Sequence, residues 1–255
     1  MQWFDAGVNL LDKRFDPHAV IANALTANVT RLCMITTHPQ EWDTAAALYQ
    51  QYPNTLCYTI GVHPHNAKHV SDNDLQRLEQ LATGPGVVAV GECGLDFNRN
   101  FSPPDTQIAV FNAQLEIAER LHKPVYLHER DAFDQQLSCL ESISNLSGIA
   151  HCFTGTQAQM QTYLSMGLYI GITGWVCDPR RAEDLRAAIP EMPLDKLILE
   201  TDAPYLFPKN QRPRRRNNEP AFIRAVGEQV ATLMSRPVTE VASASVTNTF
   251  RLFGI

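Results

Sequence analysis

A short apolar, β-branched segment recurs eight times along this chain, at intervals of roughly 25–30 residues. Such segments are typical of parallel strands that are covered on both faces, because nearly every side chain in them is apolar. The eight predicted strands are Trp3–Leu10, Leu32–Thr36, Leu56–Val62, Val87–Val90, Pro124–Leu127, Gly148–Ala150, Leu168–Thr173 and Lys196–Leu199.

Helix-start signals lie between the predicted strands. Asp16-Pro17 and Asp178-Pro179 each place a capping side chain before a proline at the first helical position. Ser102-Pro103-Pro104-Asp105 precedes residues 106–121, in which apolar side chains recur at helical spacing. Two further helices are predicted over residues 221–233 and 240–252.

The regular alternation of strands and helices predicts an α/β fold with a parallel sheet. Eight repeats favour the (β/α)8 TIM-like barrel over an open doubly wound sheet. No low-complexity linker divides the chain, so we expect a single domain over residues 1–255. With 44% hydrophobic and 19% charged residues, the composition supports a large core and argues against disorder.

The charge balance restricts how this chain could bind a polyanion. Acidic residues outnumber basic ones by 27 to 21, which gives a net charge of −6. A protein that binds nucleic acid over its whole surface is expected to be basic. Any contact with nucleic acid is therefore predicted to be local or mediated by a metal ion.

The absence of signal-like or membrane-spanning segments and the spacing of the cysteines predict a cytoplasmic location. The start of the chain has no basic region followed by an apolar stretch, and no run approaches about 18 apolar residues. The six cysteines form no C-x-x-C pair, which is typical of free thiols in a reducing compartment. We expect no membrane partner. Since no heptad pattern is present, we also expect a monomer.

Potential ligands and acid–base groups follow five of the predicted strands. They are His63, Glu92, His128, His151 and the pair Glu200 and Asp202. The carboxyl ends of the strands of a (β/α)8 fold lie on one face, which carries the active site in such enzymes. One histidine at a strand end is usually structural, and Glu92 alone could be a buried carboxylate paired with an arginine. Five such positions together predict a shared metal site.

Imidazole and carboxylate ligands suit a divalent cation. Oxygen-rich sites favour Mg²⁺ or Mn²⁺, while the histidines keep Zn²⁺ open. Such an ion polarises a phosphoryl or carbonyl oxygen and activates a water, so hydrolysis is the expected reaction class. Cys93 and Cys152 directly follow Glu92 and His151, and strand alternation points neighbouring side chains apart. We therefore interpret both cysteines as core packing.

Basic and aromatic residues near the same strand ends could bind a nucleic acid. Arg130 and Arg99 are candidates for phosphate contacts, and so is the run of Lys209, Arg212 and residues 214–216 after the last strand. The alternative for this run is an ordinary solvated loop. Five aromatic residues could stack on unpaired bases or simply fill the end of the barrel: Phe97, Phe153, Trp175, Tyr205 and Phe207.

Several motifs, in order along the chain, resemble those of the TatD family of metal-dependent hydrolases. The resemblance extends from Phe4 to Phe253 and is closest to the bacterial TatD branch. The motifs are Gly61-Val62-His63-Pro64-His65, Gly91-Glu92-Cys93-Gly94-Leu95-Asp96-Phe97, His151-Cys152-Phe153-Thr154-Gly155, Glu200-Thr201-Asp202-Ala203-Pro204-Tyr205 and Arg216-Asn217-Asn218-Glu219-Pro220.

The resemblance implies a TIM-like barrel with a divalent metal, commonly magnesium, and nuclease activity. For the bacterial branch it implies 3′–5′ exonuclease action on single-stranded DNA and RNA and a role in DNA repair. It assigns the metal ligands to Glu92, His128, His151 and Asp202. The first strand departs from the His-x-His of many family members, because Gly7 and Asn9 stand at those two places.

The combined hypothesis is hydrolysis of phosphodiester bonds at the ends of single strands. Its catalytic residues are Asp202, His63 and Glu92, with Asp202 or His63 orienting the attacking water. Its substrate-binding residues are Arg130, Arg99, Arg216 and Tyr205. Two alternatives remain open, namely a metal-dependent D-aminoacyl-tRNA deacylase and a catalytically weakened nucleic-acid-binding scaffold.

Overall fold

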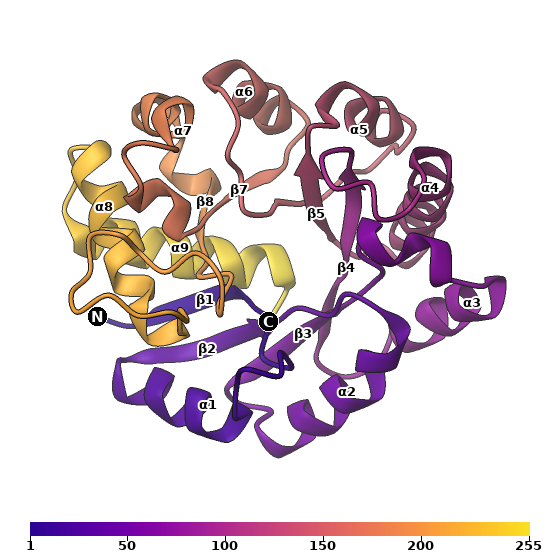
Figure 1. The fold of residues 1–255 in the computed structure, drawn as a ribbon, viewed down its shortest axis with the longest axis horizontal. Coiled ribbons are helices and arrows are strands. Elements are labelled where there is room, and N and C mark those ends of the chain that lie inside the picture. The colour runs from indigo at the N-terminus through magenta and orange to yellow at the C-terminus, as the bar shows by residue number, and fades with distance from the viewer. The chain divides into compact units, whose positions relative to one another are not determined.

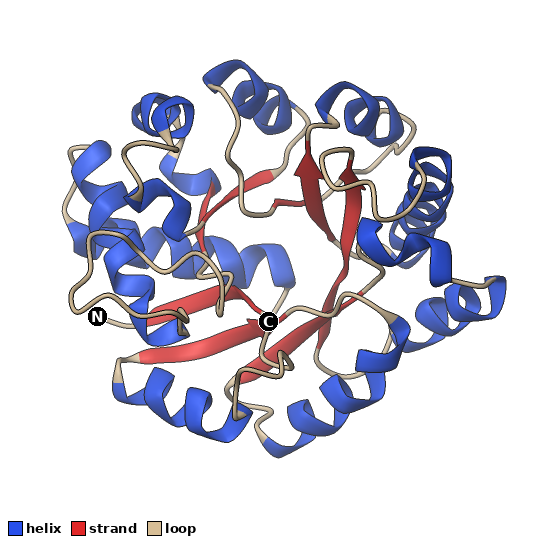
Figure 2. Ribbon diagram, in the orientation of Figure 1, coloured by secondary structure: helices blue, strands red, loops and turns tan.

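Strands and helices alternate as far as α8 in a computed structural model that describes residues 1–255, and a further helix, α9, ends the chain (Figures 1 and 2). All eight strands belong to one sheet with the order β1-β2-β3-β4-β5-β6-β7-β8. They are β1 (Trp3–Val8), β2 (Val29–Met34), β3 (Leu56–Ile60), β4 (Val87–Asp96), β5 (Val125–Arg130), β6 (Gly148–Ala150), β7 (Tyr169–Ile172) and β8 (Leu197–Leu199).

Nine α-helices and six short 3₁₀ helices connect or follow these strands. The α-helices are α1 (Pro17–Thr26), α2 (Trp42–Gln51), α3 (Asp72–Leu81), α4 (Pro104–Leu121), α5 (Phe133–Leu140), α6 (Gln157–Ser165), α7 (Glu183–Ala188), α8 (Ile223–Leu233) and α9 (Val238–Phe253). The 3₁₀ helices are η1 (Pro39–Glu41), η2 (Pro64–His69), η3 (Gly174–Cys177), η4 (Ile189–Glu191), η5 (Leu194–Lys196) and η6 (Pro220–Phe222). None of the helices combines the length and apolar character needed to cross a bilayer.

The chain divides into two compact units. The first unit comprises Met1–Met34 and Cys152–Leu252, and the second comprises Ile35–His151 and Phe253–Ile255. Each unit therefore contains four strands that are consecutive in the sheet order: β7, β8, β1 and β2 in the first, and β3 to β6 in the second.

In the first unit, the two ends of the strand sequence meet. β1 pairs with β2 and β7 pairs with β8, both in parallel. Val8 forms a parallel bridge with Ala203, and the Asp202 N–H donates to the Gly7 carbonyl at 2.9 Å. The first and last strands are thus neighbours, as a (β/α)8 fold requires.

In the second unit, β4 is the longest strand and pairs with both of its neighbours. It pairs with β3 from Tyr58 opposite Val87, and with β5 as far as Asp96 opposite Arg130. A register shift between Gly91 and Cys93 leaves Glu92 without a partner on β5. Such a bulge re-aims a side chain and is common near functional sites.

The predicted (β/α)8 TIM-like barrel fold is confirmed by the strand order and by solved structures described below. All eight predicted strands exist, but β4 and β5 run beyond the apolar segments that predicted them. Glu92 and His128 therefore lie within strands and not after them. The extension follows from backbone pairing between β4 and β5, which is independent of how apolar the side chains are.

The predicted helix starts have mixed outcomes. Asp16 does cap α1, since its side chain accepts from the His18 N–H, and α4 begins at Pro104 as the proline pair indicated. The helix start predicted at Asp178-Pro179 was wrong, because residues 179–181 form a turn and α7 begins only at Glu183. There the Asp178 side chain accepts from the Arg180 N–H and stabilises that turn.

Candidate metal centre

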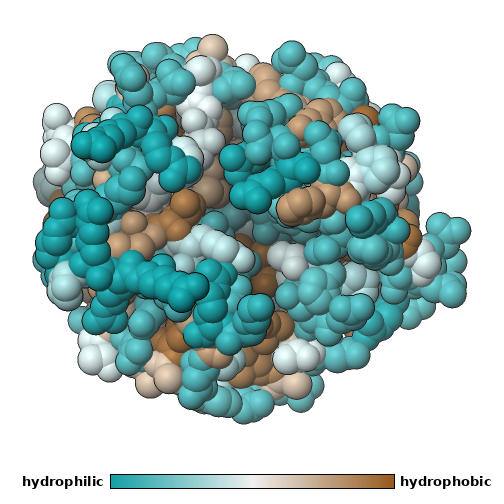
Figure 3. All heavy atoms as spheres, viewed as in Figure 1, coloured by the Kyte–Doolittle hydropathy of each residue, from teal (hydrophilic) through white to brown (hydrophobic).

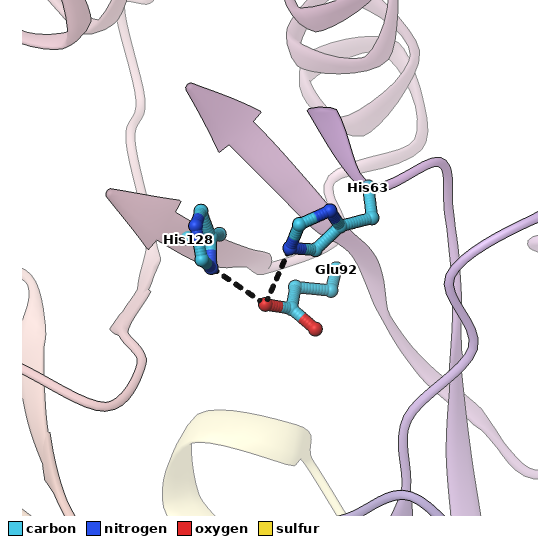
Figure 4. Close-up of side chains that lie close together, drawn as sticks. All are labelled: His63, Glu92 and His128. Atoms are coloured by element: carbon cyan, nitrogen blue, oxygen red, sulfur yellow. Dashed lines mark hydrogen bonds and ion pairs between the residues drawn. The ribbon is translucent and has the colours of Figure 1, made fainter. Parts of the chain in front are cut away.

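Three neighbouring strands of the second unit deliver a group of imidazoles and one carboxylate. Glu92 lies in β4, His128 lies in β5, and His63 follows β3 as the residue that caps η2. Figure 4 shows the two imidazoles directed at the same carboxylate oxygen. Their ligand atoms lie within 4.8 Å of one another, so these three residues could hold a metal ion.

The local backbone explains why Glu92 points into this group. Glu92 is the unpaired residue of the bulge, and its N–H donates to the Thr36 carbonyl at 3.0 Å instead of to β5. Two residues later, Gly94 lies opposite His128 with φ +136°, a region that side chains rarely adopt. A Cβ on Gly94 would lie 1.9 Å from the His128 carbonyl oxygen, so only glycine permits this approach.

Glu92 Oε1 is the shared point of the cluster. It lies 2.9 Å from His128 Nδ1, 3.5 Å from His63 Nε2 and 3.9 Å from His151 Nε2. Glu92 is 5% exposed, and burial alone raises the pKa of its carboxyl group. The surrounding imidazoles of His63, His128 and His151 outweigh burial and hold that pKa well below its usual range. Glu92 is therefore a carboxylate.

The hydrogen bonding of His63 assigns its proton. Its Nδ1 accepts from the His65 backbone N–H at 3.1 Å, so the neutral ring carries its hydrogen on Nε2 and directs it toward Glu92. Burial lowers the pKa of His63 to about 3 against the opposing charge of Glu92. His63 is thus a neutral donor at this position.

His128 lies between two carboxylates. Its Nδ1 contacts Glu92, and its Nε2 lies 3.4 Å from Asp96 Oδ2. Burial lowers the pKa of His128, but hydrogen bonding and charge from Asp96 and Glu92 outweigh burial and raise it to about 9. Nε2 is buried, and its contact with Asp96 is long at 3.4 Å, so this nitrogen could bind a cation after losing its proton.

His151 approaches Glu92 from β6. Its Nδ1 lies 2.8 Å from the Tyr126 hydroxyl, and the two rings are 4.8 Å apart. When Nδ1 donates to Tyr126, Nε2 keeps its lone pair on the side of Glu92. A fixed tautomer of this kind is what a histidine ligand needs. The donor set of carboxylate and imidazole groups therefore fits a divalent cation.

The sequence reasoning assigned no role to Asp96 or His65. His65 Nε2 lies 2.6 Å from Asp96 Oδ2, and the same oxygen faces His128. Burial raises the pKa of Asp96, but hydrogen bonds led by His128 hold it well below its usual range. The sequence did contain a signal for Asp96. If β4 continues past Val90, Glu92 and Asp96 are an even number of residues apart and therefore point to the same face of the strand.

In the first unit, Asp202 follows β8. Its carboxylate is held by Asn9, one of the two residues at which the first strand departs from the family's His-x-His pattern. The Asn9 side-chain amide donates to Asp202 Oδ1 at 2.8 Å. Asp202 itself has φ +53°. Asn9 thus orients the carboxylate that the resemblance assigns to the metal. The complete four-ligand set stays a prediction, because Asp202 and the other three residues belong to different units.

Buried neighbours of Asp202 organise the same strand end. Asp5 accepts hydrogen bonds from both the backbone N–H and the hydroxyl of Thr201. Burial raises the pKa of Asp5 to about 7 despite those hydrogen bonds. Glu200 is fully buried and accepts from the Cys152 N–H at 3.1 Å.

The two cysteines next to the site residues differ in burial. Cys152 is half-buried, and its Sγ lies 3.4 Å from the Thr173 hydroxyl. Cys93 is fully buried, as core packing requires.

The predicted substrate-binding residues are available to solvent on their own elements. Arg130 is the last residue of β5. Arg99 follows β4, and its backbone N–H donates to Asp96 Oδ1 at 2.8 Å. Arg216 is exposed in the segment after β8. Tyr205 is 47% exposed, and the Arg14 guanidinium lies 4.3 Å from the centre of its ring.

The aromatic predictions are only partly consistent with base stacking. Phe153 is buried, and Phe97, Trp175 and Phe207 are half-buried, so Tyr205 is the only one of the five with a largely exposed ring. Sequence reasoning missed Phe101, which is 52% exposed and lies 4.7 Å from the His65 ring.

Comparison with known proteins decides the family. A family model described as TatD related DNase matches residues 4–254. The chain belongs to the TatD related DNase family. Its membership agrees with the motifs that carry Glu92, His151 and Asp202.

Relatives within the TatD family cover almost the whole chain. A protein of Erwinia tasmaniensis named 3′-5′ ssDNA/RNA exonuclease TatD is 44% identical over 99% of this chain and 100% of its own length. A protein of the same name from Citrobacter rodentium is 45% identical over 99% of this chain and 98% of its own. The crystal structure of a TatD homologue from Escherichia coli matches with a TM-score of 0.91 at 30% identity, covering 99% and 98% of the two chains.

Proposed function

We propose that this protein is a metal-dependent nuclease that hydrolyses phosphodiester bonds. The observation that carries the proposal is the buried Glu92 carboxylate, on which the imidazoles of His63, His128 and His151 converge in a chain of the TatD family. A buried carboxylate with several imidazoles is suited to a divalent cation and unsuited to nucleophilic catalysis by cysteine.

The proposed ligands are Glu92, His128, His151 and Asp202. When bound there, a divalent cation supplies Lewis-acid polarisation of a phosphoryl oxygen and lowers the pKa of a water. We propose magnesium, as the family resemblance implies, while the imidazole donors also suit Mn²⁺ and Zn²⁺. His63, as an Nε2–H donor, orients the attacking water or a phosphoryl oxygen. Asn9 keeps the Asp202 carboxylate in place.

The proposed substrate is the end of a single strand of DNA or RNA, digested in the 3′–5′ direction. Support comes from the names of the curated relatives. Exposed Arg130, Arg99 and Arg216 can contact phosphates, and exposed Tyr205 and Phe101 can stack on bases. A role in DNA repair, a monomeric single-domain enzyme over residues 1–255 and a cytoplasmic location belong to the same proposal. The six free cysteines suit that location.

Chelation is expected to abolish nucleotide release. Purified protein is incubated with single-stranded DNA labelled at its 5′ end, with EDTA or with Mg²⁺, Mn²⁺ or Zn²⁺ added back. A ladder that shortens from the 3′ end, and only with metal, is the expected result. D-aminoacyl-tRNA under the same metal condition tests the alternative ester substrate. Undiminished release of nucleotides in chelator would refute the metal mechanism.

Replacement of Asn9 by alanine is expected to lower kcat by roughly 10- to 100-fold. Loss of an orienting hydrogen bond to a metal-bound carboxylate has effects of that size, and Asn9 is the donor to Asp202. The matched control is Asn23→Ala, which removes an exposed asparagine–glutamate hydrogen bond of 2.9 Å to Glu219. Equal activity of both variants would show that Asn9 does not position Asp202.

A further inference from the structure

A strongly basic cavity lies in the first unit, built from residues that the metal centre does not use. Its volume is about 450 Å³, within the range of small-molecule sites. Two stretches of the sequence, residues 180–186 and residues 209–214, supply its positive side chains. Arg180 comes from the turn after η3, Arg186 from α7, and Lys209, Arg212 and Arg214 from the segment after β8. We call these five residues the basic pocket.

The charge of the basic pocket is not balanced by the protein. Asp178 is the single acidic residue that lines the cavity, and it is paired with Lys209. The Arg186 guanidinium donates to the Val176 carbonyl at 2.8 Å, so its charge meets no carboxylate there. Arg180 and Arg214 form no side-chain hydrogen bond or ion pair within the protein. In a chain with a net charge of −6, this local excess is a marked departure from the average.

Concentrated positive charge in a concave site favours an anion. Like charges repel, so holding these guanidinium groups together costs free energy that an anionic ligand recovers. Guanidinium groups bind phosphate oxygens through paired hydrogen bonds. Figure 3 shows strongly hydrophilic side chains gathered over the left of the visible face, where Figure 1 places the segment that follows β8. The cavity is therefore shaped and charged for a phosphate group.

We propose that the basic pocket binds a phosphate of the substrate strand other than the one being hydrolysed. This inference rests on the proposed nuclease function. The pocket contains no aromatic side chain, so it contacts the backbone of the strand and does not read its bases. It contributes binding without sequence preference, and its contribution decreases as salt increases. A free mononucleotide carries the same chemistry and is the other source of phosphate to be distinguished.

The test replaces the two unpaired, exposed cations of the pocket in one variant, Arg180→Gln/Arg214→Gln. Its control, Arg236→Gln/Arg251→Gln, removes the same charge from exposed positions near and on α9. The KM for a single strand of about 20 nucleotides is expected to rise about tenfold in the pocket variant only. The salt dependence of log KM should become shallower by roughly 1.4 for two lost contacts. Hydrolysis of a dinucleotide, which has no second internal phosphodiester, should be unchanged.

Binding in EDTA separates this proposal from the proposed function. Fluorescence anisotropy of a labelled oligothymidylate measures affinity without turnover. Weaker binding by the pocket variant, with the control equal to wild type, supports the pocket even if no metal condition gives nucleotide release. Equal binding and equal salt dependence in both variants would overturn it, even in an active nuclease. Loss of thymidine monophosphate binding alone, with oligonucleotide binding intact, would also overturn it and assign the pocket to free nucleotides.

Discussion

Glu92→Gln is expected to reduce kcat about a thousandfold with little change in fold. The substitution keeps the shape of the side chain but replaces the carboxylate oxygen shared by His128, His63 and His151 with a neutral amide. A neutral amide holds a divalent cation weakly, and the transition-state stabilisation that a metal supplies is worth several kcal/mol. Metal content after dialysis should fall in parallel with the rate of nucleotide release.

The comparison for Glu92→Gln is His69→Gln, a change at an exposed residue at the end of η2. It alters a titratable side chain in the same unit but outside the cluster, so activity and metal content should equal those of wild type. Circular dichroism establishes that both variants are folded. If Glu92→Gln releases nucleotides at the wild-type rate, Glu92 is not at the reacting centre and the assignment fails.

Gly94→Ala is expected to destabilise the protein by about 4 kcal/mol. The added Cβ would lie 1.9 Å from the His128 carbonyl oxygen at a φ of +136°, so both a steric clash and backbone strain oppose it. Relief requires β4 and β5 to separate where they carry Glu92 and His128. For a chain of this length the midpoint of thermal unfolding should fall on the order of 10 °C.

Gly254→Ala separates the two causes of that loss. Gly254 also has a positive φ, +65°, but a Cβ there would meet nothing within 4 Å. We expect a cost of about 1 kcal/mol, since only the backbone penalty applies. Urea unfolding of both variants measures the difference. Equal stability of the two would mean that the close approach of β4 to β5 at Gly94 contributes nothing.

The sequence predicted the fold because the relevant signals are local. Eight apolar segments, each short and each followed by helix signals, predict the strand order without any knowledge of contacts. The same reasoning found His63, Glu92, His128 and His151, since a polar residue directly after an apolar segment is visible in one dimension. It also predicted that a helix begins at Asp178-Pro179, whereas α7 begins at Glu183, because one side chain can stabilise either a helix start or a turn.

Residues that act through pairing were harder to find. Asp96 and His65 lie within the family motifs, but sequence reasoning assigned them no role. Asp96 belongs to the part of β4 that is strand only because it pairs with β5, and His65 contacts Asp96. Asn9 was noted only as a departure from the His-x-His pattern, whereas its amide holds Asp202, a residue 193 positions away. These partners are distant along the chain, and no local pattern encodes their contact.

By itself, the sequence determined the (β/α)8 fold, the family and the strand ends at which reactive groups gather. Only the tertiary structure decided that Glu92 lies unpaired at a β-bulge, with the imidazoles packed around its carboxylate. It also brought Arg180, Arg186 and Arg214 into one cavity. The physical reason is the range of the forces concerned. Apolar periodicity acts between neighbours in sequence, whereas register, charge pairing and cavities arise when separate segments meet.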